Sequence, residues 1–271
     1  MSSRMEWDKA ASFPSVYEEL CVAGFFLGFA DELVQAAELS HGHRLLDVAT
    51  GTGIVLRRAR ERHPGLGRAT GLDLNASMLA VARQNSPPEV ELVEGSALSM
   101  PFEDGSFDVL TCQQGVQFFP DRIQAFSEFH RVLADGGHAV VACWAEVEAC
   151  PAYAAIVEVV AEQMPEALGA ALNPFALPDA GELRGLFEGA GFEDVEVDRV
   201  ELDMSFETPA DFARSYLGGS ALALILEEKP EEERQALSDA TVARLTELGG
   251  DGAFTPPLVT NVAKGRKGAR I

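Results

Sequence analysis

Hydrophobic and polar positions alternate regularly between residues 44 and 144, where short apolar runs are separated by amphipathic stretches. Such runs are typical of buried strands, and the stretches between them place apolar residues at helical spacing. The predicted strands are Arg44–Val48, Arg68–Leu72, Val90–Glu94, Phe107–Thr111 and His138–Trp144. The predicted helices are Gly53–Arg62, Ala76–Asn85 and Arg122–Leu133, with a short turn near Leu98. Apolar strands joined by helices predict a parallel sheet covered on both faces.

The pattern changes after Trp144 and becomes mainly helical. Predicted helices there are Pro151–Gln163, Gly181–Glu188, Asp211–Leu226 and Glu231–Leu248, and predicted strands are Val195–Phe206 and Leu258–Lys264. The first forty residues also predict helices and contain an aromatic cluster at Phe25, Phe26 and Phe29. We therefore expect an N-terminal helical lid over residues 1–40, a cofactor-binding core over 41–145, and the remaining core strands with helical lid insertions over 146–271.

The first predicted strand ends in a carboxylate and is followed by a turn of small residues, Asp47-Val48-Ala49-Thr50-Gly51-Thr52-Gly53. Glycine permits positive φ and lets a ligand approach the backbone, while amides at the following helix start face the loop. A phosphate-binding Walker loop needs a lysine after Gly53, which is absent. A dinucleotide fingerprint needs a third glycine where Leu56 stands. The carboxylate opposes a pyrophosphate and favours a cation.

The second predicted strand ends at Asp73, twenty residues after Gly53, where a carboxylate can accept both hydrogen bonds of a ribose diol. Together with the acidic glycine turn, the segment Gly71-Leu72-Asp73-Leu74-Asn75-Ala76-Ser77-Met78-Leu79 and the turn at Gly136-Gly137 resemble ordered motifs of one family. The chain is similar to class I S-adenosylmethionine-dependent methyltransferases, in the small-molecule group of ubiquinone and menaquinone methyltransferases (type 11). The resemblance covers about 100 residues, whereas residues 145–271 match only in outline.

The resemblance implies a doubly wound α/β fold, a Rossmann-like seven-stranded sheet, mostly parallel with an antiparallel last strand, and S-adenosyl-L-methionine as cofactor. It assigns residues to the amino-acid end of the cofactor, to its ribose and to its adenine. The implied cofactor-binding residues are Asp47, Ala49, Thr50, Gly51, Gly53, Asp73, Leu74, Met78, Ser96, Ala97 and Gln113. Two of them depart from the family pattern: Ala49 replaces a glycine, and Ser96 stands where the family has an aspartate.

Candidate catalytic residues are fewer. Gln113 and Gln117 follow the fourth predicted strand, where the methyl donor and the acceptor should meet, and Tyr17 lies in the expected lid. All five histidines fall where the amino edge of the sheet is expected, so we expect no histidine base. Enzymes that methylate amino groups of nucleic-acid bases often carry the motif Asn/Asp-Pro-Pro-Tyr/Phe after the fourth strand. This chain has Cys-Gln-Gln-Gly at that place instead. No Cys or His spacing predicts a metal site.

The formal net charge of −22 argues against unaided binding to nucleic acid or to an anionic membrane. The four cysteines form no CxxC pair, the N-terminus lacks an apolar signal core, and no apolar run reaches transmembrane length. We therefore expect a cytoplasmic methyltransferase with a small, largely apolar acceptor. An alternative is an S-adenosylmethionine-binding protein of the same fold without methyl transfer; an NAD-dependent oxidoreductase is disfavoured by Leu56. The acceptor atom (O, N or C) and the oligomeric state stay open.

Overall fold

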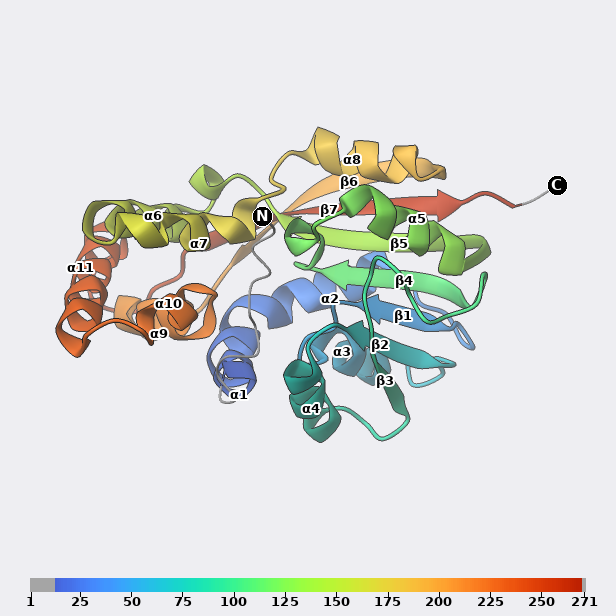
Figure 1. Cartoon of the computed structure of the whole chain (residues 1–271), viewed down its shortest axis with the longest axis horizontal. Helices are drawn as coiled ribbons and strands as arrows, with labels where there is room; N and C mark the ends of the chain where they lie inside the picture. The colour runs from blue at the N-terminus through green and yellow to red at the C-terminus, as the bar shows by residue number, and fades with distance from the viewer. Residues whose placement is uncertain (1–12, 270–271) are drawn as a thin grey trace.

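A seven-stranded sheet forms the centre of the computed structural model, which describes residues 13–269 (Figure 1). Its strand order is β3-β2-β1-β4-β5-β7-β6. The strands are β1 Leu45–Val48, β2 Ala69–Asp73, β3 Val90–Glu94, β4 Phe107–Gln113, β5 Leu133–Trp144, β6 Phe192–Asp203 and β7 Pro257–Lys267. β1 to β5 pair in parallel, while β7 runs antiparallel to both β5 and β6. This confirms the predicted doubly wound methyltransferase fold.

Helices cover both faces of the sheet because alternate side chains of each strand point to opposite sides. Leu45 joins an apolar cluster with α2 and α3, whereas Leu46 joins a cluster with α5 and α8 on the other face. These helices are α2 Leu27–Ala36, α3 Ile54–Arg62, α5 Arg122–Val132 and α8 Ala180–Gly189, and α4 Ala76–Asn85 follows β2. The core therefore consists of two apolar layers, one on each face of the sheet.

A second group of helices lies beyond the carboxyl end of β4, to the left in Figure 1. Its members are α6 Pro151–Gln163, α7 Leu168–Leu172, α9 Pro209–Gly219, α10 Leu222–Leu226 and α11 Glu231–Gly249. Short helices connect them or follow strands: η2 Val116–Phe118, η3 Val147–Ala149, η4 Pro165–Ala167 and η5 Asn173–Phe175. Aromatic rings fill the space between this group and the sheet; the Phe25 ring lies 5.1 Å from that of Phe212 in an edge contact.

The N-terminal segment forms one continuous helix of 24 residues, Phe13–Ala36. It comprises α1 Phe13–Tyr17, the π-helix η1 Glu18–Phe26, and α2. By length and composition alone it could cross a membrane, which corrects the expectation that no apolar run reaches that length. Its residues Leu33 and Val34 are buried against the sheet, and 39% of its apolar 18-residue window is buried within the fold.

Three predicted boundaries differ from the structure. The helix predicted over 211–226 breaks at Ser220 into α9 and α10, because the Ser220 hydroxyl accepts a hydrogen bond from the Leu222 amide. β6 begins and ends three residues earlier than predicted. The predicted turn at Gly136-Gly137 lies inside β5, where the pairing with β4 shifts register and Gly136 adopts φ +79°. The division into lid and core regions stays a prediction, and its first twelve residues lie outside the described part.

Candidate functional site

The glycine turn, residues 49–53, connects β1 to α3 through left-handed backbone. Gly51 has φ +56° and Gly53, which caps α3, has φ +86°. Ala49 is also left-handed, with φ +54°. For a residue with a side chain this conformation costs about 1–2 kcal/mol. Ala49, which stands where the family pattern has glycine, therefore carries backbone strain. The turn therefore has the backbone shape that the sequence predicted.

Asp47 lies at the carboxyl end of β1 and is 1% exposed. Its carboxylate accepts hydrogen bonds from the hydroxyls of Thr50, at 2.6 Å, and Thr111, at 2.8 Å. Burial raises the pKa of Asp47 to about 7; the two hydroxyls oppose that shift, and the charge of Asp73 adds to it. A nearby cation would stabilise the charged form, so this position is suited to a positively charged ligand.

Asp73 ends β2 and ties the glycine turn to the neighbouring strand. One carboxylate oxygen accepts from the Gly51 amide and the other from the Asn75 amide, both at 2.8 Å. Burial raises the pKa of Asp73, and these amides partly counteract it. Each carboxylate oxygen keeps a second lone pair. The geometry therefore leaves Asp73 able to accept from a diol while its position is fixed by the backbone.

The start of α4 lies beside Asp73. The Asn75 side chain caps the helix by accepting from the amides of Ser77 and Met78. Met78 is buried with Phe13 of α1, and Tyr17 packs against the same cluster. Leu74, in contrast, is 65% exposed. The roles of Met78 and Leu74 beside an adenine stay predictions.

The turn after β3 carries the other two predicted adenine contacts. The Ser96 hydroxyl accepts from the Leu98 amide at 3.1 Å, so one of its lone pairs is used within the turn. Ala97 is partly buried against the apolar layer on the α5 side. Ser96 keeps a second lone pair for an amino group, and contacts from Ser96 and Ala97 to the cofactor stay predictions.

The segment after β4 packs directly on the glycine turn. A Cβ on Gly115 would lie 2.7 Å from the Ala49 Cβ, so only glycine fits there. Gln113 donates from Nε2 to the Phe26 carbonyl of η1 at 2.9 Å, while its Oε1 is buried without a partner. Gln117, 3% exposed, also has a buried and unpartnered Oε1. A buried acceptor without a donor costs free energy, so both oxygens indicate a place for a ligand donor.

Tyr17 is the last residue of α1 and packs against the cluster that contains Met78. Its ring lies 5.4 Å from that of Phe26. Burial is the largest cause that raises the pKa of Tyr17 well above its usual range. The charges of Cys21, Glu18 and Asp73 raise it further, in that order. The structure thus brings Tyr17 close to Asp73, and its substrate-facing role stays a prediction.

A salt bridge that the sequence did not reveal links the N-terminal helix to the glycine turn. Arg57 of α3 pairs with Glu18 of η1 at 2.7 Å and also donates to the Thr52 carbonyl at 2.7 Å. The partners are 39 residues apart. No sequence motif marks them, because the pairing depends on how η1 crosses the sheet edge.

His43 and His138 make hydrogen bonds with backbone groups. His138 shares a hydrogen bond of 2.8 Å with the Ala37 carbonyl, and burial lowers the pKa of its ring. His63 follows the last residue of α3. Within residues 13–269 no group of three His, Cys, Asp or Glu side chains could hold a metal ion.

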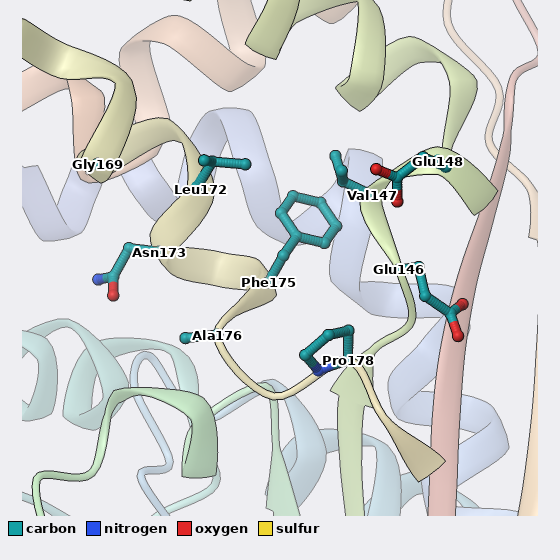
Figure 2. Close-up of a pocket in the computed structure, with 9 residues that line it drawn as sticks. All are labelled: Glu146, Val147, Glu148, Gly169, Leu172, Asn173, Phe175, Ala176 and Pro178. Atoms are coloured by element: carbon teal, nitrogen blue, oxygen red, sulfur yellow. The ribbon is translucent and has the colours of Figure 1, made fainter.

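A pocket of about 510 Å³ lies between η3 and the α7–η5 segment (Figure 2). The Phe175 ring projects between Leu172 and Val147, and Pro178 lies below it. Glu146 and Glu148 are the charged residues in its lining, and no lysine or arginine belongs to that lining. The pocket is therefore an apolar cleft with acidic residues at its side.

These residues fit S-adenosylmethionine, which combines a sulfonium, an ammonium group and a ribose diol. The buried carboxylate at the end of β1 favours positive charge, and the half-buried carboxylate at the end of β2 favours diol hydroxyls. The left-handed turn between them allows close approach to the backbone. The unpartnered Gln113 oxygen adds an acceptor at the neighbouring strand end.

A family model described as a methyltransferase domain matches residues 46–141. The demethylmenaquinone methyltransferase of Staphylococcus epidermidis is 32% identical over 179 residues, covering 61% of this chain and 74% of that protein. The corresponding protein of Chlorobaculum tepidum is 47% identical over 98 residues, but the match spans only 39% of its length and 36% of this chain.

A solved structure shares the fold at lower identity. Phosphoethanolamine N-methyltransferase 2 of Haemonchus contortus, bound to phosphomonomethylethanolamine and S-adenosylhomocysteine, is 19% identical with a TM-score of 0.61. The alignment covers 96% of this chain and 58% of that one. At this identity the likeness concerns the fold alone, and it extends into the helices beyond the core.

Proposed function

The chain belongs to the class I S-adenosylmethionine-dependent methyltransferase family, in the group that includes menaquinone and ubiquinone methyltransferases, and from this premise we propose that it methylates a small, largely apolar molecule. The observation that carries the proposal is the pair of carboxylates, buried Asp47 and half-buried Asp73, held on either side of a left-handed turn. That arrangement suits a ligand that is both cationic and a nucleoside.

The cofactor supplies a methyl carbon already activated by a sulfonium, so the protein contributes mainly proximity and alignment. Asp73 would hold the ribose, and the glycine turn with Asp47 would hold the amino-acid end. Gln113 would fix the strand end at which the methyl group meets the acceptor. Tyr17 and the unpartnered oxygen of Gln117 are the polar groups proposed to face that acceptor.

The acceptor is proposed to be small and largely apolar because the surrounding lid is aromatic and the described pocket lacks basic residues. The curated relatives in quinone biosynthesis are consistent with this class. The chain spans less than half of several of them, so quinones themselves are not carried over as substrates. We place the protein in the cytoplasm, with no nucleic-acid or membrane partner, in keeping with its acidic charge.

Calorimetry with S-adenosylmethionine, S-adenosylhomocysteine and NAD tests the cofactor assignment. Binding of the first two without NAD supports it, and NAD binding alone contradicts it. Incubation with methyl-labelled cofactor and a metabolite extract tests turnover. Label in an extracted small molecule supports methyl transfer and identifies the acceptor. Tight cofactor binding with no transferred label would instead favour the non-methylating alternative.

A further inference from the structure

Three buried polar side chains form a continuous row beneath the acceptor side of the sheet, and we call Gln117, Gln114 and Thr260 the amide chain. Gln117 Nε2 contacts Gln114 Oε1 at 3.4 Å, and Gln114 Nε2 contacts the Thr260 hydroxyl at 3.0 Å. The Thr260 hydroxyl lies 2.7 Å from the Cys143 carbonyl. All three side chains are buried, so water does not compete for these bonds.

The direction of every hydrogen bond in the amide chain is fixed from its inner end. A carbonyl only accepts, so the single hydroxyl proton of Thr260 must lie toward Cys143. The Thr260 oxygen must then accept from Gln114, which turns the Gln114 amide so that its NH₂ faces threonine. Gln114 Oε1 is left to accept from the NH₂ of Gln117. The chain therefore ends at Gln117 Oε1, an oxygen that can only accept.

That terminal oxygen is buried and has no partner among the described residues. The backbone at Gln114 is left-handed, with φ +50°, an uncommon conformation for a glutamine. Strain and an unsatisfied buried acceptor both cost free energy, and such costs concentrate at functional sites. A ligand with a hydrogen-bond donor would satisfy the oxygen.

The surroundings of Gln117 indicate the rest of that ligand. Arg122 donates to the carbonyls of both Gln117 and Ala176, at 3.1 and 2.9 Å, which places η2 beside the wall of the pocket in Figure 2. The lining there is mainly apolar, and its charged members are Glu148 and Glu146, the second of which pairs with Arg199 at 2.9 Å. The nearby Arg122 is paired with Glu182 at 3.1 Å, so Glu148 would repel an anionic group, while an apolar body would find apolar walls.

We propose that Gln117 Oε1 accepts a hydrogen bond from an O–H or N–H of the methyl acceptor, and that the amide chain makes the site select a donor-bearing apolar molecule over an ether or a carboxylate. Gln117 is the specificity residue. Gln114 and Thr260 are positioning residues, because they fix which end of the Gln117 amide faces the ligand. The inference rests on the proposed function and names the acceptor class for the same site.

Three matched probes test the selection on the full-length protein saturated with S-adenosylhomocysteine. 2-Naphthol has a donor, 2-methoxynaphthalene has the same ring without one, and 2-naphthoate is an anion. Their dissociation constants are measured by ligand-detected NMR titration. We expect 2-naphthol to bind about 3- to 10-fold more tightly than 2-methoxynaphthalene, the range of one net hydrogen bond, and 2-naphthoate to bind most weakly.

Two pairs of variants separate specificity from folding. Gln117→Leu should abolish the preference for 2-naphthol, while Gln117→Glu, which keeps an acceptor oxygen, should retain a preference. Thr260→Val removes the hydroxyl that fixes the chain and should reduce the preference, whereas Thr260→Ser should preserve it. Circular dichroism and S-adenosylhomocysteine affinity confirm folding in each case. If Gln117→Leu fails to fold, the Thr260 pair still decides.

Equal affinity for 2-naphthol and its methyl ether, no binding of any probe, or tighter binding of 2-naphthoate would overturn the inference. So would a preference that persists in both Gln117→Leu and Thr260→Val. Failure of the proposed function is recognised separately. If S-adenosylhomocysteine does not bind, that function fails, and the same probes titrated on the cofactor-free protein still decide the role of the amide chain.

Discussion

The proposed donor and acceptor sides of the carboxyl edge are assembled differently. On the donor side, the ends of β1 and β2, Asp47 bonds to Thr50 three residues away and Asp73 to Gly51 22 residues away. On the acceptor side, the ends of β4 and β5, Gln113 bonds to Phe26 across 87 residues and Gln114 to Thr260 across 146.

This difference in sequence separation explains how freely each side can change between members of a family. The donor side is built mostly within one strand–turn–helix–strand unit, to which Thr111 of β4 adds one hydrogen bond to Asp47, so a single stretch of sequence carries most of its geometry. The acceptor side needs the N-terminal helix, the β4 end and β7 to meet, so its specificity depends on distant segments. A family can therefore keep one methyl donor while the acceptor changes. Four experiments, in order of expected effect, probe this contrast.

The largest effect is expected from Asp47→Asn. The pKa of Asp47 is about 7 in the folded protein and near 3.8 when unfolded, so between these values the folded state holds a proton that the unfolded state has lost. The stabilising contribution of Asp47 is full below about pH 4 and lost as pH rises through 7. At 1.36 kcal/mol per unit this amounts to about 4 kcal/mol.

The substituted asparagine cannot titrate, so the stability of Asp47→Asn relative to the wild type should rise by about 4 kcal/mol from pH 4 to pH 8 in the cofactor-free protein. Urea unfolding at several pH values measures this. Asp198→Asn, at an exposed position of β6, serves as the control and should show little pH-dependent difference. A difference that stays constant with pH for Asp47→Asn would contradict the buried-carboxylate account of the donor side.

Asp73→Ala should lower S-adenosylmethionine affinity more than tenfold, because it removes a charged acceptor worth about 1.5–3 kcal/mol. It also frees the amides of Gly51 and Asn75 that the carboxylate holds. Calorimetry measures the affinity, with Glu196→Ala on the exposed edge strand as the matched control. Unchanged affinity would show that Asp73 does not contribute to binding the methyl donor.

The Glu18–Arg57 pair joins the lid helix to the donor side, and a double-mutant cycle tests the connection. Glu18→Gln and Arg57→Met should each destabilise the protein, and the double variant should lose less than their sum. We expect a coupling of about 1 kcal/mol for a pair that is 23% and 18% exposed. Urea unfolding of the four proteins gives the coupling free energy. Strictly additive losses of stability would show that the contact between Glu18 and Arg57 does not stabilise the fold.

Ala49→Gly should have the smallest effect. It relieves a left-handed cost of about 1–2 kcal/mol but adds about 0.5–1 kcal/mol of backbone entropy loss on folding. The net expectation is a stabilisation of up to about 1 kcal/mol with cofactor affinity little changed. Ala243→Gly, at an exposed position of helix α11, should instead destabilise by about 1 kcal/mol. Destabilisation by both variants would contradict the strain at Ala49.

The sequence predicted the parallel strands and the left-handed glycine turn because these depend on local periodicity and on glycine, whereas the antiparallel last strand was implied by the family resemblance. The same turn allowed Asp47 and Asp73 to be placed at one edge. Thr260 and Arg57 were missed because their partners are distant in the chain. The break at Ser220 was missed because the apolar spacing continues through it, and only the hydroxyl contact with Leu222 ends the helix.

The π-helical stretch before α2 determines how the residues that precede it are rotated about the helix axis. In η1 the Leu27 amide bonds five residues back to Val22, one more than in an α-helix. Each residue of an α-helix advances about 100° around its axis. Removing one residue from η1 would therefore turn Tyr17 about a quarter of a revolution away from Asp73, so the orientation of the lid depends on the number of residues in this wide turn.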